Sequence, residues 1–238
     1  MQAHPALTSE IWPRQIANRI EQGKSVVVLV PVTERDPLDP GLSEEERCRA
    51  QGFGHEAGRN AFVTGRILLR RVLSEFVPEP RVETGPHGKP YCVRTEAPEF
   101  NLSHAAGGIA AVFSRKGPVG VDLEGTERAP KSISRLAERV FSPEERKLVT
   151  RNPDLFLALW TRKEAVLKTM GTGFSAGASD LDAESVAREN AWSLCSFRRD
   201  RWTGAVCAPV ASSPVLVLDG NSTDFPLSDD PSLIEYRA

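Results

Sequence analysis

The chain has 238 residues, of which 40% are hydrophobic and 26% charged, a composition typical of globular proteins with a substantial core. The formal net charge of −2 argues against a nucleic-acid partner, and no apolar run approaches the roughly 18 residues of a membrane span. Residues 1–10 lack the pattern of a secretory signal, and the four cysteines form no Cys-x-x-Cys pair, so we expect free thiols and a cytoplasmic protein.

The N-terminal part predicts a buried strand followed by two helices. Residues 25–32 are rich in valine and are bounded by prolines, as in a buried strand. Ser43 is a suitable N-cap for a helix that carries Arg47 and Arg49, because acidic residues occupy its first turn. Residues 56–76 then predict a long amphipathic helix.

Arginines are concentrated on the long helix, which carries Arg59, Arg66, Arg70 and Arg71. Such a density indicates anion binding as one interpretation. The other is a solvated helix face whose arginine stems pack on the protein, which is the more common case.

Two short stretches in the middle of the chain favour phosphate binding. Lys89 lies in the glycine- and proline-rich loop 85–91, where a rigid backbone would hold its charge for a phosphate, although loop lysines are more often solvated. Ser103 and His104 end a short strand at residues 100–104. A serine hydrolase is disfavoured, because there is no Gly-x-Ser-x-Gly motif and adjacent side chains on a strand diverge.

An acidic strand is predicted at residues 120–124. Asp122 and Glu124 alternate with apolar residues, so both carboxylates leave the same face of the strand. Two neighbouring carboxylates repel each other unless a cation lies between them, and oxygen ligands suit Mg²⁺. We also expect this strand to form a hairpin with residues 109–113.

A helix is predicted from Leu155 to Met170, and spacings of four place Trp160, Glu164 and Lys168 on one face. Glu164 is a candidate third oxygen ligand. Lys168 and its neighbour Lys163 add positive charge, and a metal, an acid and two lysines together indicate phosphate chemistry. The alternative is a solvated strand edge and an exposed helix face with ion pairs.

Five motifs follow one another along the chain. They are Gly88-Lys89-Pro90, Phe100-Asn101-Leu102-Ser103-His104, Gly120-Val121-Asp122-Leu123-Glu124, Phe141-Ser142-Pro143-Glu144-Glu145 and the stretch from Trp160 to Lys168. In order and spacing the chain resembles the two-lobed, surfactin-synthetase-activating type of 4′-phosphopantetheinyl transferase, over roughly residues 47–173. That family transfers 4′-phosphopantetheine from coenzyme A to a serine of a carrier protein and releases 3′,5′-ADP.

The resemblance implies roles for the residues of the acidic strand and the helix. Asp122, Glu124 and Glu164 match the family's metal-binding acids, which bind Mg²⁺, with Mn²⁺ as a possible substitute. Lys163 and Lys168 match lysines near the pyrophosphate. The carrier serine must lose a proton, and Glu164 or a metal-bound water is the better candidate base, with Lys168 a weaker one.

The resemblance also implies contacts to coenzyme A in the N-terminal part. Lys89, Ser103 and His104 match contacts to its 3′-phosphoadenosine end. The candidates for further phosphate contacts are Arg47, Arg49 and Arg59. Phe62 stands where some members have a threonine that touches the nucleotide.

The fold class predicted for the chain is α+β, with antiparallel strands and a long helix in each half. The resemblance implies two similar lobes, at residues 1–117 and 118–219, with coenzyme A between them and a mobile tail at 220–238. We expect a monomer. Residues 126–139 are the expected contact with an acidic carrier, through Arg128, Lys131, Arg135 and Arg139.

Two other functions are compatible with parts of the pattern. The first is a non-catalytic protein of the same fold that binds a carrier or coenzyme A, but such a protein has no need for three convergent acids. The second is a Mg²⁺-dependent nucleotide hydrolase, and the lack of a Gly-x-x-x-x-Gly-Lys loop weighs against it.

Overall fold

The computed structural model describes residues 11–85, 88–127, 133–172, 179, 181–218, 224, 225 and 227. Its helices are α1 (Ile11–Glu21), α2 (Glu44–Gln51), α3 (Glu56–Leu73), α4 (Ile133–Val140), α5 (Pro143–Arg151), α6 (Leu155–Met170) and α7 (Ala183–Glu189). Its strands are β1 (Val26–Pro31), β2 (Val82–Thr84), β3 (Pro90–Cys92), β4 (Glu99–Ala105), β5 (Gly108–Ser114), β6 (Gly120–Gly125), β7 (Trp192–Arg199), β8 (Trp202–Pro209), β9 (Val215–Leu218) and β10 (Asp224–Phe225). The predicted α+β class is confirmed.

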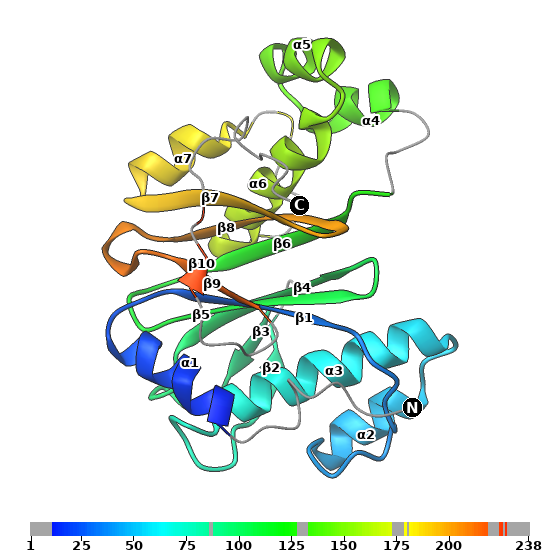
Figure 1. Cartoon of the computed structure of the whole chain (residues 1–238), viewed down its shortest axis with the longest axis vertical. Coiled ribbons are helices and arrows are strands. Elements are labelled where there is room, and N and C mark those ends of the chain that lie inside the picture. The colour runs from blue at the N-terminus through cyan, green and yellow to red at the C-terminus, as the bar shows by residue number, and fades with distance from the viewer. Residues whose placement is uncertain are drawn as a thin grey trace.

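The strands form two main sheets that face each other. The larger sheet has the order β10-β9-β1-β5-β4, the smaller has the order β6-β8-β7, and β2 and β3 form a separate pair. All neighbouring strands are antiparallel except β1 and β9. Figure 1 shows α1 and α3 on the outer side of the larger sheet, and α6 and α7 on the outer side of the smaller one.

The apolar sequence of β1 follows from this layering. Val26, Val28 and Val30 pack with α1 and α3, whereas Val27 and Leu29 pack between the two sheets. Because both faces of the strand are covered, both sets of alternating side chains are apolar. The predicted buried strand is therefore confirmed.

The predicted hairpin between residues 109–113 and 120–124 is wrong. β5 pairs with β1 and β4, whereas β6 pairs with β8, so the chain crosses from one sheet to the other between them. Gly117 lies in this crossing with φ +136, a conformation that favours glycine.

The crossing between β5 and β6 lies at the expected division near residue 117, and the division into two lobes stays a prediction. β9 and β10 come late in the chain, yet they belong to the larger sheet with β1, β4 and β5. The two sheets differ in strand number, five against three, and the expected similarity of two lobes stays a prediction. Most of the expected tail, residues 220–238, lies outside the described residues. In the described part of the chain, no helix combines the length and apolar character that crossing a membrane requires.

Candidate functional site

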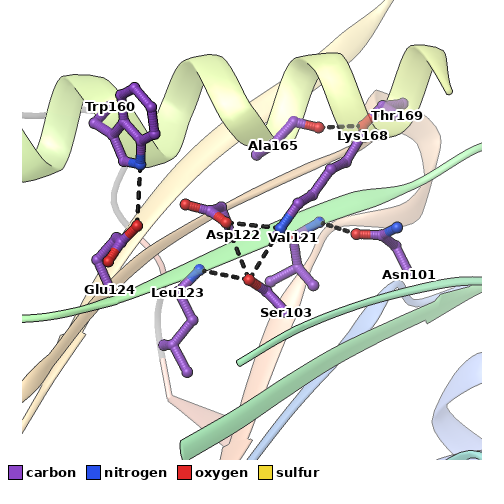
Figure 2. A network of polar contacts seen from close by, with 10 residues as sticks. All are labelled: Asn101, Ser103, Val121, Asp122, Leu123, Glu124, Trp160, Ala165, Lys168 and Thr169. Atoms are coloured by element: carbon purple, nitrogen blue, oxygen red, sulfur yellow. Dashed lines mark hydrogen bonds and ion pairs between the residues drawn. The ribbon is translucent and has the colours of Figure 1, made fainter. Parts of the chain in front are cut away.

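The acidic strand β6 lies at the edge of the smaller sheet, and α6 crosses its outer face (Figure 2). Val121 and Leu123 point into the core between the sheets, which leaves Asp122 and Glu124 on the side of α6. Gly120 permits the close approach of the helix, because a Cβ there would collide with the Ala165 carbonyl and would lie 2.6 Å from the Thr169 nitrogen. The predicted strand and helix thus meet through their functional faces.

Lys168 joins the acidic strand to the larger sheet. Its ammonium lies 2.7 Å from Asp122 Oδ1 and donates to Ser103 Oγ at 2.9 Å and to the Val121 carbonyl at 3.1 Å (Figure 2). Asp122 is only 5% exposed, and its second oxygen, Oδ2, is buried without a hydrogen-bond partner. An ionised carboxylate with one unsatisfied oxygen is suited to accept a cation or a donor.

Glu164 shares the electrostatic environment of the two strand acids. Burial, Asp122 and Glu124 raise the pKa of Glu164 to about 7, against the opposing effect of Lys168. The indole of Trp160 donates to Glu124 Oε1 at 3.1 Å, which orients that carboxylate. This agrees with the prediction that Trp160, Glu164 and Lys168 share one side of the helix.

The acids do not form a closed ligand cage as they stand. Among the described residues, no group of three or more His, Cys, Asp or Glu side chains is arranged to hold a metal ion. The unsatisfied Asp122 oxygen and the raised pKa of Glu164 nevertheless fit a divalent cation, because such an ion would relieve both. The metal site stays a prediction.

Lys163 occupies a different place from the one expected beside the pyrophosphate. It is 2% exposed, its ammonium lies 2.6 Å from Glu145 Oε2, and it donates to the Val140 carbonyl at 3.0 Å. Glu145 is itself fixed, because it closes the capping box with Ser142 at the start of α5. Lys163 thus anchors α6 to α5 and to the end of α4, and the structure does not bring it to the acids.

A cavity of about 280 Å³ lies on the side of α3 that faces β4. Its lining includes Arg49, Phe53, Phe62, Arg66, Leu102 and His104. The guanidinium carbons of Arg49 and Arg66 lie 5.0 and 5.3 Å from the centre of the Phe62 ring. Two cations therefore converge on one aromatic wall of this space, which we call the arginine cavity.

The arginine cavity is lined by a guanidinium with one unpartnered donor, although Nε of the same Arg66 lies 3.8 Å from Glu46 Oε1. Nη1 of Arg66 is buried without a hydrogen-bond partner, and burial together with Arg49 and Arg70 lowers the pKa of Arg66 despite Glu46. Burial and Lys168 also lower the pKa of His104. An anion would supply acceptors for these donors, so the cavity is suited to a phosphate group.

Only one of the three predicted arginines lines the cavity. Arg49 does so, whereas Arg47 donates to the Leu42 carbonyl at 2.8 Å. Arg59 lies 3.9 Å from the exposed Glu56, and its Nε is buried without a partner. Arg66 was not selected from the sequence, although its position four residues after Phe62 places both on one helix face.

Lys89 and Ser103 do not line the arginine cavity. The Lys89 ammonium donates to the carbonyls of Val119 and Lys168, at 3.2 and 2.9 Å. Ser103 lies between Lys168 and Asp122, and its neighbour Asn101, which sequence reasoning did not select, accepts from the Val121 amide at 3.1 Å. These side chains connect the two sheets.

Comparisons with known proteins show the family of the chain. The family model of the 4′-phosphopantetheinyl transferase superfamily matches residues 118–207. The protein slr0495 of Synechocystis sp. (strain ATCC 27184 / PCC 6803 / Kazusa), named provisionally as a 4′-phosphopantetheinyl transferase, is 30% identical over 204 residues, which cover 79% of this chain and 80% of slr0495. The 4′-phosphopantetheinyl transferase AcpT of Salmonella typhi is 34% identical over 63% of this chain and 77% of its own length, and psf-1 of Bacillus pumilus is 31% identical over 62% and 66%. This chain therefore belongs to the 4′-phosphopantetheinyl transferase superfamily and is a transferase of that class.

Proposed function

We propose that this protein transfers 4′-phosphopantetheine from coenzyme A to a serine hydroxyl of an apo carrier protein, with Mg²⁺ or Mn²⁺, and releases 3′,5′-ADP. The observation that carries this proposal is the unsatisfied Asp122 oxygen close to Glu164, with Lys168 2.7 Å from the other Asp122 oxygen. Acidic oxygen donors beside a lysine are suited to a pyrophosphate and its counter-ion. A cytoplasmic location and a monomeric state are part of the same proposal.

We assign the nucleotide end of coenzyme A to the arginine cavity. Arg49 and Arg66 offer guanidinium donors, and the Phe62 ring offers a face on which a base can stack. His104 lines the same cavity, and burial together with the charge of Lys168 lowers the pKa of His104, which supports a position of the cavity near the acidic strand. When the arginines hold one phosphate group of coenzyme A, the pyrophosphate of the same molecule lies near Lys168.

Asp122, Glu124 and Glu164 are the residues that would hold the divalent cation. A bound Mg²⁺ would supply neutralisation of the pyrophosphate oxygens. The chain's own contribution is to fix these acids. Lys168 holds Asp122, and the Trp160 indole holds Glu124. Gly120 lets α6, the helix that carries Glu164, pack closely against β6.

The transfer step needs a proton acceptor and charge stabilisation. The serine Oγ–H bond breaks as the Oγ–P bond forms, and the anhydride P–O bond breaks with its electron pair leaving on 3′,5′-ADP. Glu164 is the proposed acceptor of the proton, because it is the acid of this group that the helix α6 carries together with Lys168. Lys168 is paired with Asp122, so we assign it the role of stabilising the transferred phosphoryl group by its positive charge rather than that of proton acceptor.

The carrier protein is proposed to meet the region that ends in α4. Arg135 and Arg139 are exposed there and would suit an acidic surface. The other two expected basic residues, Arg128 and Lys131, lie outside the described residues.

The experiment is the intact mass of an apo carrier protein after incubation with this protein, coenzyme A and Mg²⁺, beside a Glu164→Gln variant. We expect a gain of one phosphopantetheine that the variant loses. Tight coenzyme A binding with no gain on any acyl or peptidyl carrier would favour the non-catalytic alternative. Release of 3′,5′-ADP without a carrier would favour a hydrolase.

A further inference from the structure

The two sheets are connected at one end by a tryptophan. Trp202 is the first residue of β8 and follows the turn of the β7–β8 hairpin in the smaller sheet. Its indole Nε1 donates to the carbonyls of Ala105 and Ala106, at 3.1 and 3.3 Å, in the turn between β4 and β5 of the larger sheet. The side chain is 8% exposed and packs in the core between the sheets. Figure 1 shows both hairpin turns at the same end of the two sheets.

The partners of Trp202 on either side adjoin a residue of the candidate site. Ala105 directly follows His104, which lines the arginine cavity. In the smaller sheet, Trp202 pairs with Gly125, which directly follows Glu124 of the acidic strand. The backbone is therefore fixed, in both sheets, within one residue of a side chain that the proposed function uses.

Two glycines permit this close contact between the sheets. A Cβ on Gly108 would lie 2.6 Å from the indole nitrogen of Trp202, and a Cβ on Gly125 would lie 2.5 Å from the Cβ of Ala106. Neither Gly108 nor Gly125 has a positive φ, so their backbone conformation suits any residue. The close approach of the two sheets is thus what requires glycine at both positions.

Backbone hydrogen bonds hold the two turns as well. The Val32 amide, which follows β1, donates to the Gly107 carbonyl of the β4–β5 turn at 2.8 Å. The Thr126 amide, which follows β6, donates to the Arg201 carbonyl of the β7–β8 turn at 2.8 Å. Each turn is therefore fixed to a strand of its own sheet, and the indole of Trp202 fixes one turn to the other.

We propose that Trp202, Gly108 and Gly125, which we call the tryptophan clamp, set the distance between the arginine cavity and the acidic strand. Trp202 is then a positioning residue for the transfer reaction, acting through the backbone next to His104 and Glu124. This inference rests on the proposed function, in which one coenzyme A molecule reaches from the cavity to the acids.

The benefit of a fixed distance follows from how a ligand with two contact points binds. Once one end is bound, the second contact forms within the same complex, and its gain depends on the geometry that joins the two sites. A variable distance reduces this joint gain, whereas each site still binds its own part of the ligand. Loss of the tryptophan clamp should therefore weaken coenzyme A more than a fragment that occupies the cavity alone.

The first test is Trp202→Phe, which keeps an aromatic ring and removes the indole donor. We expect the Kd of coenzyme A in the presence of Mn²⁺, measured by calorimetry, to rise about tenfold, the effect of about one lost hydrogen bond. The Kd of adenosine 3′-phosphate and that of Mn²⁺ alone should each change less than about twofold. Trp192→Phe, at the far end of the same hairpin, is the matched control and should change none of them. An equal loss for adenosine 3′-phosphate would overturn the proposal, because the indole would then shape the cavity itself.

A second variant reaches the same contact from the larger sheet. Gly108→Ala places a methyl group against the indole, so we expect it to weaken coenzyme A about tenfold as well. In a Trp202→Leu background the same substitution should add less than about twofold, because its steric partner is gone. Full additivity of the two substitutions would contradict a shared contact. Gly108→Ala also serves if Trp202→Phe does not fold.

Hydrogen exchange tests the clamp without any ligand. In Trp202→Phe we expect the Val32 amide, whose acceptor is in the β4–β5 turn, to exchange about tenfold faster. Unchanged Val32 exchange together with unchanged coenzyme A binding in the folded variant would overturn the proposal. If the unaltered protein modifies no carrier, the proposed function fails, and with it the role in transfer. Faster Val32 exchange would still show that the indole holds the turn, so the two failures are distinguishable.

Discussion

The acidic strand with α6 and the arginine cavity on α3 differ in how the protein satisfies their polar groups. Lys168 has three partners within the protein, and Ser103 uses its whole hydrogen-bonding capacity. On the cavity side, Arg66 Nη1 is buried without a partner. Lys168 and Ser103 are thus held by the protein itself, whereas Arg66 Nη1 is suited to an anion and Asp122 Oδ2 to a cation or a donor.

The largest effect is expected from a substitution on the acidic side, which comprises the acidic strand and α6. Asp122→Asn removes the charge that pairs with Lys168 and the oxygen that fits a cation, so we expect kcat to fall about a thousandfold. The rate of carrier modification by intact mass is the measurement, with Mg²⁺ binding followed by calorimetry. The exposed Glu189→Gln on α7 is the control. Full activity of Asp122→Asn would remove this residue from the site.

The next effect tests whether Lys163 belongs to the preorganised framework rather than to the pyrophosphate site. Lys163→Met leaves Glu145 without its buried partner, and we expect the free energy of unfolding to fall by about 3 kcal/mol. Urea unfolding measures this loss. The KM for coenzyme A of the folded fraction should not change. A higher KM with unchanged stability would show that Lys163 contacts the substrate instead.

A smaller effect is expected from a substitution in the arginine cavity. Arg66→Met should raise the KM for coenzyme A about 10- to 30-fold with little change in kcat, because a charged hydrogen bond to phosphate is lost. Steady-state kinetics measure it, and the exposed Arg14→Met on α1 is the control. An equal loss with 3′-dephospho-coenzyme A would place Arg66 on another group of the substrate.

The smallest effect is a pH dependence of stability without divalent cations. The pKa of Glu164 is raised from 4.5 to about 7, so the folded protein binds a proton that the unfolded chain releases. The stabilisation is fully present below about pH 4.5 and is lost as the pH rises through about 7. After solvent screening we expect about 1 kcal/mol, measured by urea unfolding at several pH values. Glu164→Gln should lack this slope, and an unchanged slope would assign it to other groups.

The sequence predicted the acidic side well because local spacing determines it. A period of two on a strand placed Asp122 and Glu124 on one face, and spacings of four placed Glu164 with Lys168. The N-cap Ser43 was equally local, and it forms a capping box at the start of α2.

The sequence did not predict features that depend on distant partners. The direction of Lys163 depends on Glu145 in another helix, and the crossing between β5 and β6 depends on which strand each one pairs with. Asn101 was missed because its partner, a backbone amide of β6, leaves no trace in side-chain chemistry. For the arginines, the cavity wall that selects Arg66 over Arg47 exists only after α3 has packed.

The return of β9 to lie parallel with β1 has a consequence for synthesis on the ribosome. Val26 to Leu29 gain their second neighbour only when residues 215–218 have left the exit tunnel. The smaller sheet ends at residue 209, so it can be complete while the larger sheet still has an open, valine-rich edge. The sheet that begins first along the chain is therefore completed last, and until then the open edge of β1 is available for pairing with other chains.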